Sequence, residues 1–166
     1  MQASTSIDLL NKGVADELQA VHQYMYWHFH LTDQGFAPLA TLLKRTAIVE
    51  MGHVEKLAER ILFLKGDVKM EAAGPIEPSV EPAQILAKAA QMEQGSARDY
   101  NQAAIACGAN ADAASKQVFE LLVGQEEGHF DAFDKQLEHI KRYGPSYLAL
   151  QSFGRGAAEG AAPAEA

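Results

Sequence analysis

Four long stretches of this sequence repeat apolar residues every three or four positions, which is the spacing of one face of an α-helix. The first stretch begins at Ile7 and stops before Gly35, and the others cover about 37–65, 82–108 and 111–143. Residues 145–152 are predicted as a short fifth helix. The periodicity therefore predicts an all-α fold.

Residues that commonly start or stop helices lie at the ends of these stretches. The predicted stops are Gly35, Gly66, Gly108 and Gly144, and Pro38, Pro82 and Pro145 suit first turns. The predicted caps are Ser4, Thr5 or Ser6 for the first helix and Asn110 for the fourth.

The segment between the second and third helices, residues 67–81, lacks periodicity and contains Gly74, Pro75 and Pro78, so it is predicted as a loop. The other two joints are short, which makes the helices beside them antiparallel. A helix of about 28 residues is about 42 Å long, and fifteen extended residues reach about 50 Å. The loop can therefore cross the whole bundle. We predict a four-helix bundle with one long crossover loop and a short C-terminal helix over 1–153, followed by a flexible low-complexity tail, 154–166.

Ionisable side chains interrupt the apolar stripes of all four long helices. Four ionised carboxylates inside one bundle would each cost several kcal/mol of desolvation, and the stripes contain no lysine or arginine. Two divalent cations would balance the four negative charges, and neutral imidazoles would complete a ligand set that suits iron or manganese. The six predicted metal ligands are Glu17, Glu50, His53, Glu93, Glu126 and His129.

The spacing of these residues supports a paired metal site. Two Glu-x-x-His motifs, 50–53 and 126–129, each place a carboxylate and an imidazole on one helix face. Two such motifs plus one glutamate from each of the other helices is the arrangement of ferritin-like di-iron proteins.

The ligands also repeat at one constant offset along the chain. This offset relates Glu17 to Glu93, Glu50 to Glu126, His53 to His129 and Tyr24 to Tyr100. The repeat predicts two helix pairs related by a pseudo-twofold axis.

Other acidic and histidine residues are predicted to have ordinary roles. Glu55, Glu59, Glu127 and Glu138 fall off the stripes and are interpreted as solvated. His22, His30 and His139 are interpreted as surface or interface residues, and His28 as a hydrogen-bonded core histidine.

Composition excludes several other classes of protein. A formal charge of −8 without a basic patch argues against nucleic-acid binding. A single cysteine, Cys107, cannot form an internal disulfide framework, a cysteine-rich zinc site or an iron–sulfur cluster. No apolar stretch is long enough to cross a bilayer, and charged residues interrupt the N-terminal segment, so neither a membrane span nor a signal peptide is predicted. The expected location is cytoplasmic.

The chain resembles the bacterioferritins over about residues 5–153. Besides the six ligands, the resemblance includes Asn11-Lys12, His22-Gln23-Tyr24, the two Glu-x-x-His motifs, residues 59–66 and Tyr147-Leu148. Rubrerythrins share the ligand spacing but add a four-cysteine module, which one cysteine cannot supply.

The resemblance implies a ferroxidase that oxidises Fe(II) at an intrasubunit di-iron centre and stores ferric mineral in a 24-subunit shell. It implies two iron ions per subunit, with Glu50 and Glu126 bridging them. Tyr24 matches a tyrosine near the centre. Terminal ligands are then Glu17 and His53 on one iron, and Glu93 and His129 on the other.

The resemblance also implies a b-type haem shared between two subunits, with Met51 as its ligand. The expected assembly is a homo-oligomer built from dimers, with a paralogous subunit and a ferredoxin-type electron donor for iron release as further candidate partners. The short fifth helix would help to line a fourfold channel. Spacing alone favours interface packing for Met51, so haem binding rests on the resemblance.

The chain departs from some bacterioferritins at four positions. Arg45 and Val49 occupy positions of an inner-surface iron site, which we therefore expect to be absent, and Leu57 and Ala132 replace aromatic residues near the centre.

Two other functions remain possible from the sequence. One is a di-iron or di-manganese oxidoreductase of small oligomeric state that acts on an organic substrate or peroxide, and the other is a non-catalytic shell or haem carrier.

Overall fold

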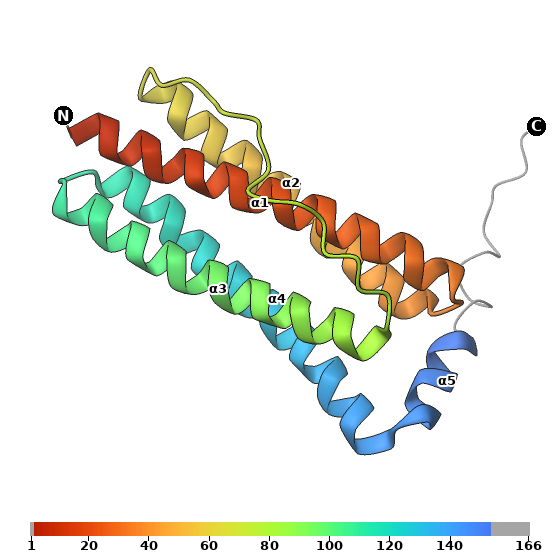
Figure 1. Cartoon of the computed structure of the whole chain (residues 1–166). Coiled ribbons are helices and arrows are strands. Elements are labelled where there is room, and N and C mark those ends of the chain that lie inside the picture. The colour runs from red at the N-terminus through yellow and green to blue at the C-terminus, as the bar shows by residue number, and fades with distance from the viewer. Residues whose placement is uncertain (1, 154–166) are drawn as a thin grey trace, which may run out of the picture.

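A computed structural model describes the secondary structure of residues 2–153, which form five helices and, over that range, no strand (Figure 1). The helices are α1 (Gln2–Asp33), α2 (Ala37–Phe63), α3 (Pro82–Ala109), α4 (Ala113–Tyr143) and α5 (Pro145–Phe153). The predicted all-α bundle is confirmed. The tail predicted over 154–166 lies outside the described residues. Among the described helices, none combines the length and apolar character that a bilayer span requires.

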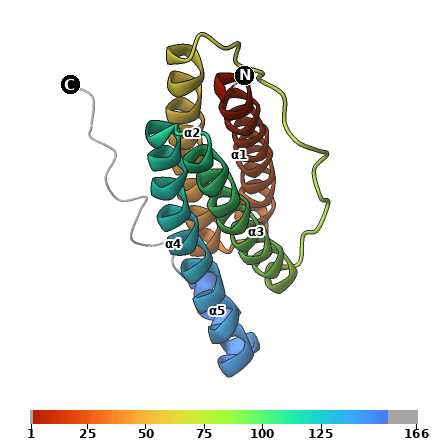
Figure 2. The ribbon, with the colours of Figure 1, turned by 90° about the vertical axis from the view of Figure 1, so that its left-hand side faces the viewer.

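The four long helices form two antiparallel pairs, α1 with α2 and α3 with α4, and the crossover loop runs along the bundle between them (Figure 1). As predicted, this loop leaves α2 and α3 parallel. Helix α5 turns away at one end of the bundle, where it contacts α4 and α2 (Figure 2).

Two predicted caps are wrong. Helix α1 begins at Gln2, before the predicted serine and threonine caps, and Ser6 is fully buried within it. Asn110 ends α3, while Asp112 caps α4 by accepting a hydrogen bond of 3.1 Å from the backbone N–H of Ser115. The reason is that Ala111 between them takes a left-handed conformation, with φ of 57°, which turns the chain before the second helix begins.

The predicted glycine stops have different roles. Gly35, with φ of 86°, supplies the expected left-handed turn after α1. Gly108 lies inside α3, which continues to Ala109. After α2 the left-handed residue is Lys65, and Gly66 serves close packing instead, because a Cβ there would lie 2.9 Å from a methyl carbon of Ile7.

Side-chain amides of α1 hold the crossover loop in place. Asn11 donates a hydrogen bond to the carbonyl of Asp67 and accepts one from the N–H of Lys69. Gln23 donates to the carbonyl of Glu77 and accepts from its N–H. Gln19 pairs in the same way with Gly74 and Pro75. Each amide thus satisfies backbone groups of a segment that has no secondary structure of its own.

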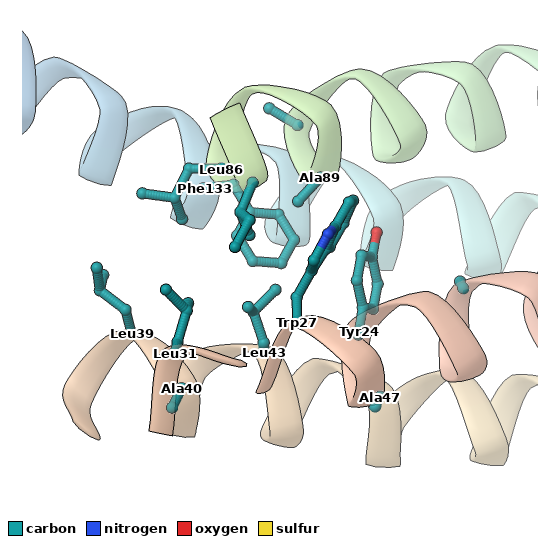
Figure 3. Close-up of a cluster of buried hydrophobic side chains, with 13 residues drawn as sticks. Tyr24, Trp27, Leu31, Leu39, Ala40, Leu43, Ala47, Leu86, Ala89 and Phe133 are labelled. Carbon is teal, nitrogen blue, oxygen red and sulfur yellow. The ribbon is translucent and has the colours of Figure 1, made fainter. Parts of the chain in front are cut away.

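The apolar core consists of two clusters, one toward each end of the bundle. One contains Tyr24, Trp27 and Leu31 of α1 together with Phe133 of α4 (Figure 3). The other contains Leu10 and Val14 of α1 and residues of the three remaining long helices. Along α1, Glu17 falls between the two clusters. Glu17 therefore lies in a layer of the bundle that has one apolar cluster on either side.

Candidate metal centre

The six predicted ligands converge in the layer between the two apolar clusters. Glu17 comes from α1, the 50–53 motif from α2, Glu93 from α3 and the 126–129 motif from α4. Five of the six are almost fully buried, with at most 2% of each residue exposed. Only the His129 side chain, at 16%, reaches the surface. All four helices therefore contribute to one buried cluster, because each places its ligands on the stripe that faces the core.

The cluster divides into two overlapping groups of four ligands. Ligand atoms of Glu17, Glu50, His53 and Glu126 lie within 4.8 Å of one another, and so do those of Glu50, Glu93, Glu126 and His129. Glu50 and Glu126 belong to both groups. This arrangement suits two cations that share two carboxylates and have one further carboxylate and one imidazole each.

Both imidazoles direct Nδ1 toward the carboxylates. The Nδ1 atom of His53 lies 2.7 Å from Glu50, 3.0 Å from Glu126 and 3.1 Å from Glu17. The Nδ1 atom of His129 lies 2.9 Å from Glu50, and 3.7 Å from both Glu93 and Glu126. The two rings are stacked, with centroids 5.9 Å apart. Each imidazole therefore lies close to the terminal carboxylate of its own group and to the two shared carboxylates, Glu50 and Glu126.

Several buried atoms of the cluster have no hydrogen-bond partner among the described residues. They include both carboxylate oxygens of Glu50, Oε1 of Glu126 and Nδ1 of His129. Buried polar atoms are normally satisfied, and leaving them without partners costs about 1–3 kcal/mol each. Cations between these atoms would satisfy all of them, so the donor set fits a pair of divalent metal ions.

Shifted pKa values are found for the carboxyl groups of Glu17, Glu93 and Glu126. Burial raises the pKa of Glu17 to about 8, and it raises the pKa of Glu93 well above its ordinary value. Burial also acts on Glu126, but the nearby imidazoles of His129 and His53 outweigh it and lower the pKa of Glu126 to about 2. Without metal, the terminal carboxyl groups of Glu17 and Glu93 therefore hold their protons to higher pH than a free glutamate does, while Glu126 carries charge.

The pKa values of both imidazoles are raised, although burial alone would lower them. Burial lowers the pKa of His53, but the close carboxylates of Glu126, Glu17 and Glu50 outweigh it and raise the pKa to about 11. Contacts with the carboxylates likewise raise the pKa of His129 to about 12 against the effect of its burial. At neutral pH the metal-free centre thus holds two imidazolium cations, which balance carboxylate charge in the way that metal ions would.

Two tyrosines surround the ligands. Tyr24 donates a hydrogen bond to Oε1 of Glu93, as expected for a residue near the centre. Tyr100 donates one of 2.7 Å to Oε1 of Glu17. The sequence did not identify Tyr100 as a site residue, although the constant offset that relates it to Tyr24 was a usable signal.

Met51 lies apart from these ligands. It is 53% exposed on α2, near Ile48, which is 57% exposed. Of the other interpreted residues, His28 is half-buried with Nδ1 2.8 Å from the carbonyl of Ala40, which confirms its hydrogen-bonded role. The glutamates interpreted as solvated are exposed, as are Arg45 and Val49, whereas Leu57 is fully buried in the core.

Comparisons with known proteins agree with this geometry. The ferritin-like domain family matches residues 7–143. The bacterioferritin of Desulfovibrio desulfuricans is 34% identical, covering 86% of this chain and 80% of its own, and that of Rhodobacter capsulatus is 35% identical, covering 87% and 89%. An X-ray structure of the Desulfovibrio desulfuricans bacterioferritin, which describes its diiron site in different catalytic states, has a TM-score of 0.91 at 32% identity and covers 99% of this chain and 96% of that one.

Proposed function

This chain belongs to the bacterioferritin family of ferritin-like proteins, and from that membership and its paired ligand groups we propose that it is an iron-storage ferroxidase. The observation that carries the proposal is the sharing of Glu50 and Glu126 between two buried groups of four ligands. Two ferrous ions held on shared carboxylates lie close enough to deliver their electrons to one oxidant molecule.

The proposed ligands divide into terminal and bridging roles. Glu17 and His53 hold one ferrous ion, Glu93 and His129 hold the other, and the two remaining glutamates bridge them. Two ferrous ions give one electron each to dioxygen, which takes up two protons and becomes hydrogen peroxide. A second ferrous pair reduces that peroxide, with two protons, to two water molecules. Anionic oxygen ligands favour the ferric product because they stabilise the higher positive charge.

The proposal includes storage of the ferric product in a 24-subunit cytoplasmic shell. Large apolar side chains exposed on the single chain are consistent with burial between copies. They include Phe63 at the end of α2 and Leu150 and Phe153 on α5. Helix α5 has no buried residue in the isolated chain, so contact with other copies would give its apolar side chains a partner. In the shell this helix would line a fourfold channel.

The test uses the intact protein. Size-exclusion chromatography with light scattering is expected to give a particle whose mass is 24 times the 18.0 kDa of one chain. Stopped-flow absorbance after anaerobic Fe(II) loading is expected to show rapid oxidation with two Fe(II) per chain on mixing with dioxygen or peroxide. A small particle that oxidises an organic substrate would favour the oxidoreductase alternative, and a shell without oxidation would favour the non-catalytic one.

We also propose that Met51 binds a b-type haem shared with a second copy of the chain. Met51 is 53% exposed beside Ile48, and its sulfur together with that of Met51 from a second copy would hold the haem iron. Met51→Leu is expected to remove the Soret band of the purified protein, because leucine keeps the size but not the sulfur. Met70→Leu, at a similarly exposed methionine in the crossover loop, is the matched control. A full Soret band in the Met51 variant would contradict haem ligation.

A further inference from the structure

Two tyrosine hydrogen bonds cross between the helix pairs on the two sides of the metal centre. Tyr24 of α1 donates to Glu93 of α3, and Tyr100 of α3 donates to Glu17 of α1. The same offset along the chain relates both the donors and the acceptors. Each terminal carboxylate is therefore oriented by a residue from the opposite helix pair.

The two bonds engage their carboxylates differently. On Glu93 the tyrosine contacts Oε1, while Oε2 faces His129 at 3.7 Å. On Glu17 the hydroxyl of Tyr100 and Nδ1 of His53 both contact Oε1, at 2.7 and 3.1 Å. Tyr100 thus holds in place the same oxygen that lies beside the imidazole.

Packing fixes the ring of Tyr100. The residue is 2% exposed, and its ring centroid lies 5.7 Å from that of Phe119. Gly13 of α1 lies beside the ring, because a Cβ there would be 3.6 Å from Cε1 of Tyr100 and 3.0 Å from Leu57. The burial of Tyr100 and its contact with Phe119 orient the ring, and its hydroxyl thereby meets the Glu17 carboxylate.

Tyr100 also differs from Tyr24 in its access to solvent. Its ring lines a surface cavity of about 310 Å³ between α1 and α3, at whose rim Lys12 forms ion pairs with Asp16 and Asp99. Tyr24 is fully buried and packs against Trp27 and Phe133. Tyr100 therefore lines the cavity and also bonds to Glu17, which is 2% exposed and does not line it.

We propose that Tyr100 is a positioning residue that holds Glu17 in its ligating orientation, and so maintains the metal affinity of the Glu17–His53 position. Tyr24 is its counterpart for the Glu93–His129 position. The inference rests on the proposed metal-binding function. Loss of a hydrogen-bonding partner of a ligating side chain typically lowers metal affinity by about 10- to 100-fold.

The experiment separates the two positions with redox-inert Co(II), followed by d–d absorption and calorimetry. His129→Ala leaves Glu17 and His53 as the intact terminal pair. In that background Tyr100→Phe is expected to weaken Co(II) binding by at least about tenfold, and Tyr24→Phe is expected to have little effect. In a His53→Ala background the two phenylalanine variants should exchange their effects. Tyr143→Phe, at a half-exposed tyrosine, is the control.

The outcomes distinguish this inference from the proposed function. A wild-type protein that fails to bind two Co(II) per chain would contradict the metal centre itself. Binding of Co(II) with unchanged affinity in the Tyr100→Phe, His129→Ala protein would overturn the role of Tyr100 alone. Thermal unfolding of metal-free Tyr100→Phe should stay close to that of the Tyr143 control. A loss of the folded state would also overturn the inference, because it would make the hydroxyl a structural requirement.

Discussion

Glu126→Ala is expected to lower the initial rate of Fe(II) oxidation by at least a hundredfold, whereas Glu127→Ala leaves the rate unchanged. Glu126 belongs to both ligand groups, so its removal affects both metal positions at once. Loss even of an indirect partner of a ligand commonly costs about 10- to 100-fold. Glu127 is the adjacent residue of the same type, but its side chain is exposed. The pair therefore compares the same chemical change inside and outside the centre.

The rate is measured by stopped-flow absorbance with two Fe(II) per chain, and the fold by far-ultraviolet circular dichroism. The helical signal should persist in both variants, because two complete apolar clusters flank the ligand layer. Rapid oxidation by a folded Glu126→Ala protein would show that this residue does not bridge the metals. An equal loss of rate in the Glu127 variant would show that the effect comes from the helix rather than from the centre.

The second large effect is expected in the pH dependence of metal binding. In the metal-free protein the pKa values of His53 and His129 are raised to about 11 and about 12, and that of Glu17 to about 8. These groups therefore carry protons at pH 7. A divalent cation must displace the protons to reach the ligand atoms, so metal affinity should rise more than tenfold per pH unit between pH 6 and pH 8.

The same pKa shifts determine whether the free energy of unfolding of the metal-free protein rises or falls with pH. A carboxyl group whose pKa is raised on folding contributes stability below its unfolded value of 4.5, and for Glu17 that contribution is lost as the pH rises toward 8. The imidazoles lose theirs from pH 6.5 upward. Each proton held only by the folded chain corresponds to about 1.4 kcal/mol per pH unit. The metal-free protein should therefore become less stable from pH 5 to pH 9.

Isothermal titration calorimetry with Zn(II), in buffers of different ionisation enthalpy, counts the protons released. Glu17→Gln should release fewer protons than the wild type at pH 7, because an amide binds no proton in this range. Urea unfolding at pH 5, 7 and 9, in the presence of chelator, measures the stability trend. Release of no protons, or a metal-free stability that rises with pH, would contradict the assigned protonation states.

The fold and the convergence of the six predicted ligands were predictable because they arise from the same pattern. A helical stripe that faces a core should be apolar, so an acid such as Glu93 on that stripe predicted a compensating cation. The i, i+3 motifs then predicted a paired metal centre. The length of the crossover loop predicted that α2 and α3, the helices it joins, run parallel. None of these inferences needed the position of a single side chain.

Details that depend on one backbone angle or on contacts across the bundle were not predictable. The cap of α4 is Asp112 rather than Asn110 because Ala111 adopts a left-handed conformation, which its residue type does not indicate. The amides of Asn11 and Gln23 are visible as polar positions on the first helix, but their partners are backbone groups of a loop without any pattern. Likewise, the offset linked Tyr100 to Tyr24, but only the packed bundle reveals that Tyr100 bonds to Glu17.

Because the predicted ligands are divided between the two helix pairs, a bound metal would also stabilise the docking of one pair on the other. Most helix contacts lie within each pair, and fewer join α1 to α3 or α2 to α4. Each metal position takes ligands from both pairs, so its binding free energy adds to the docking of one helical hairpin on the other. A chain with undocked hairpins has neither position complete. Metal binding would thus favour chains whose two hairpins are correctly docked, because only those chains bring both groups of four ligands together.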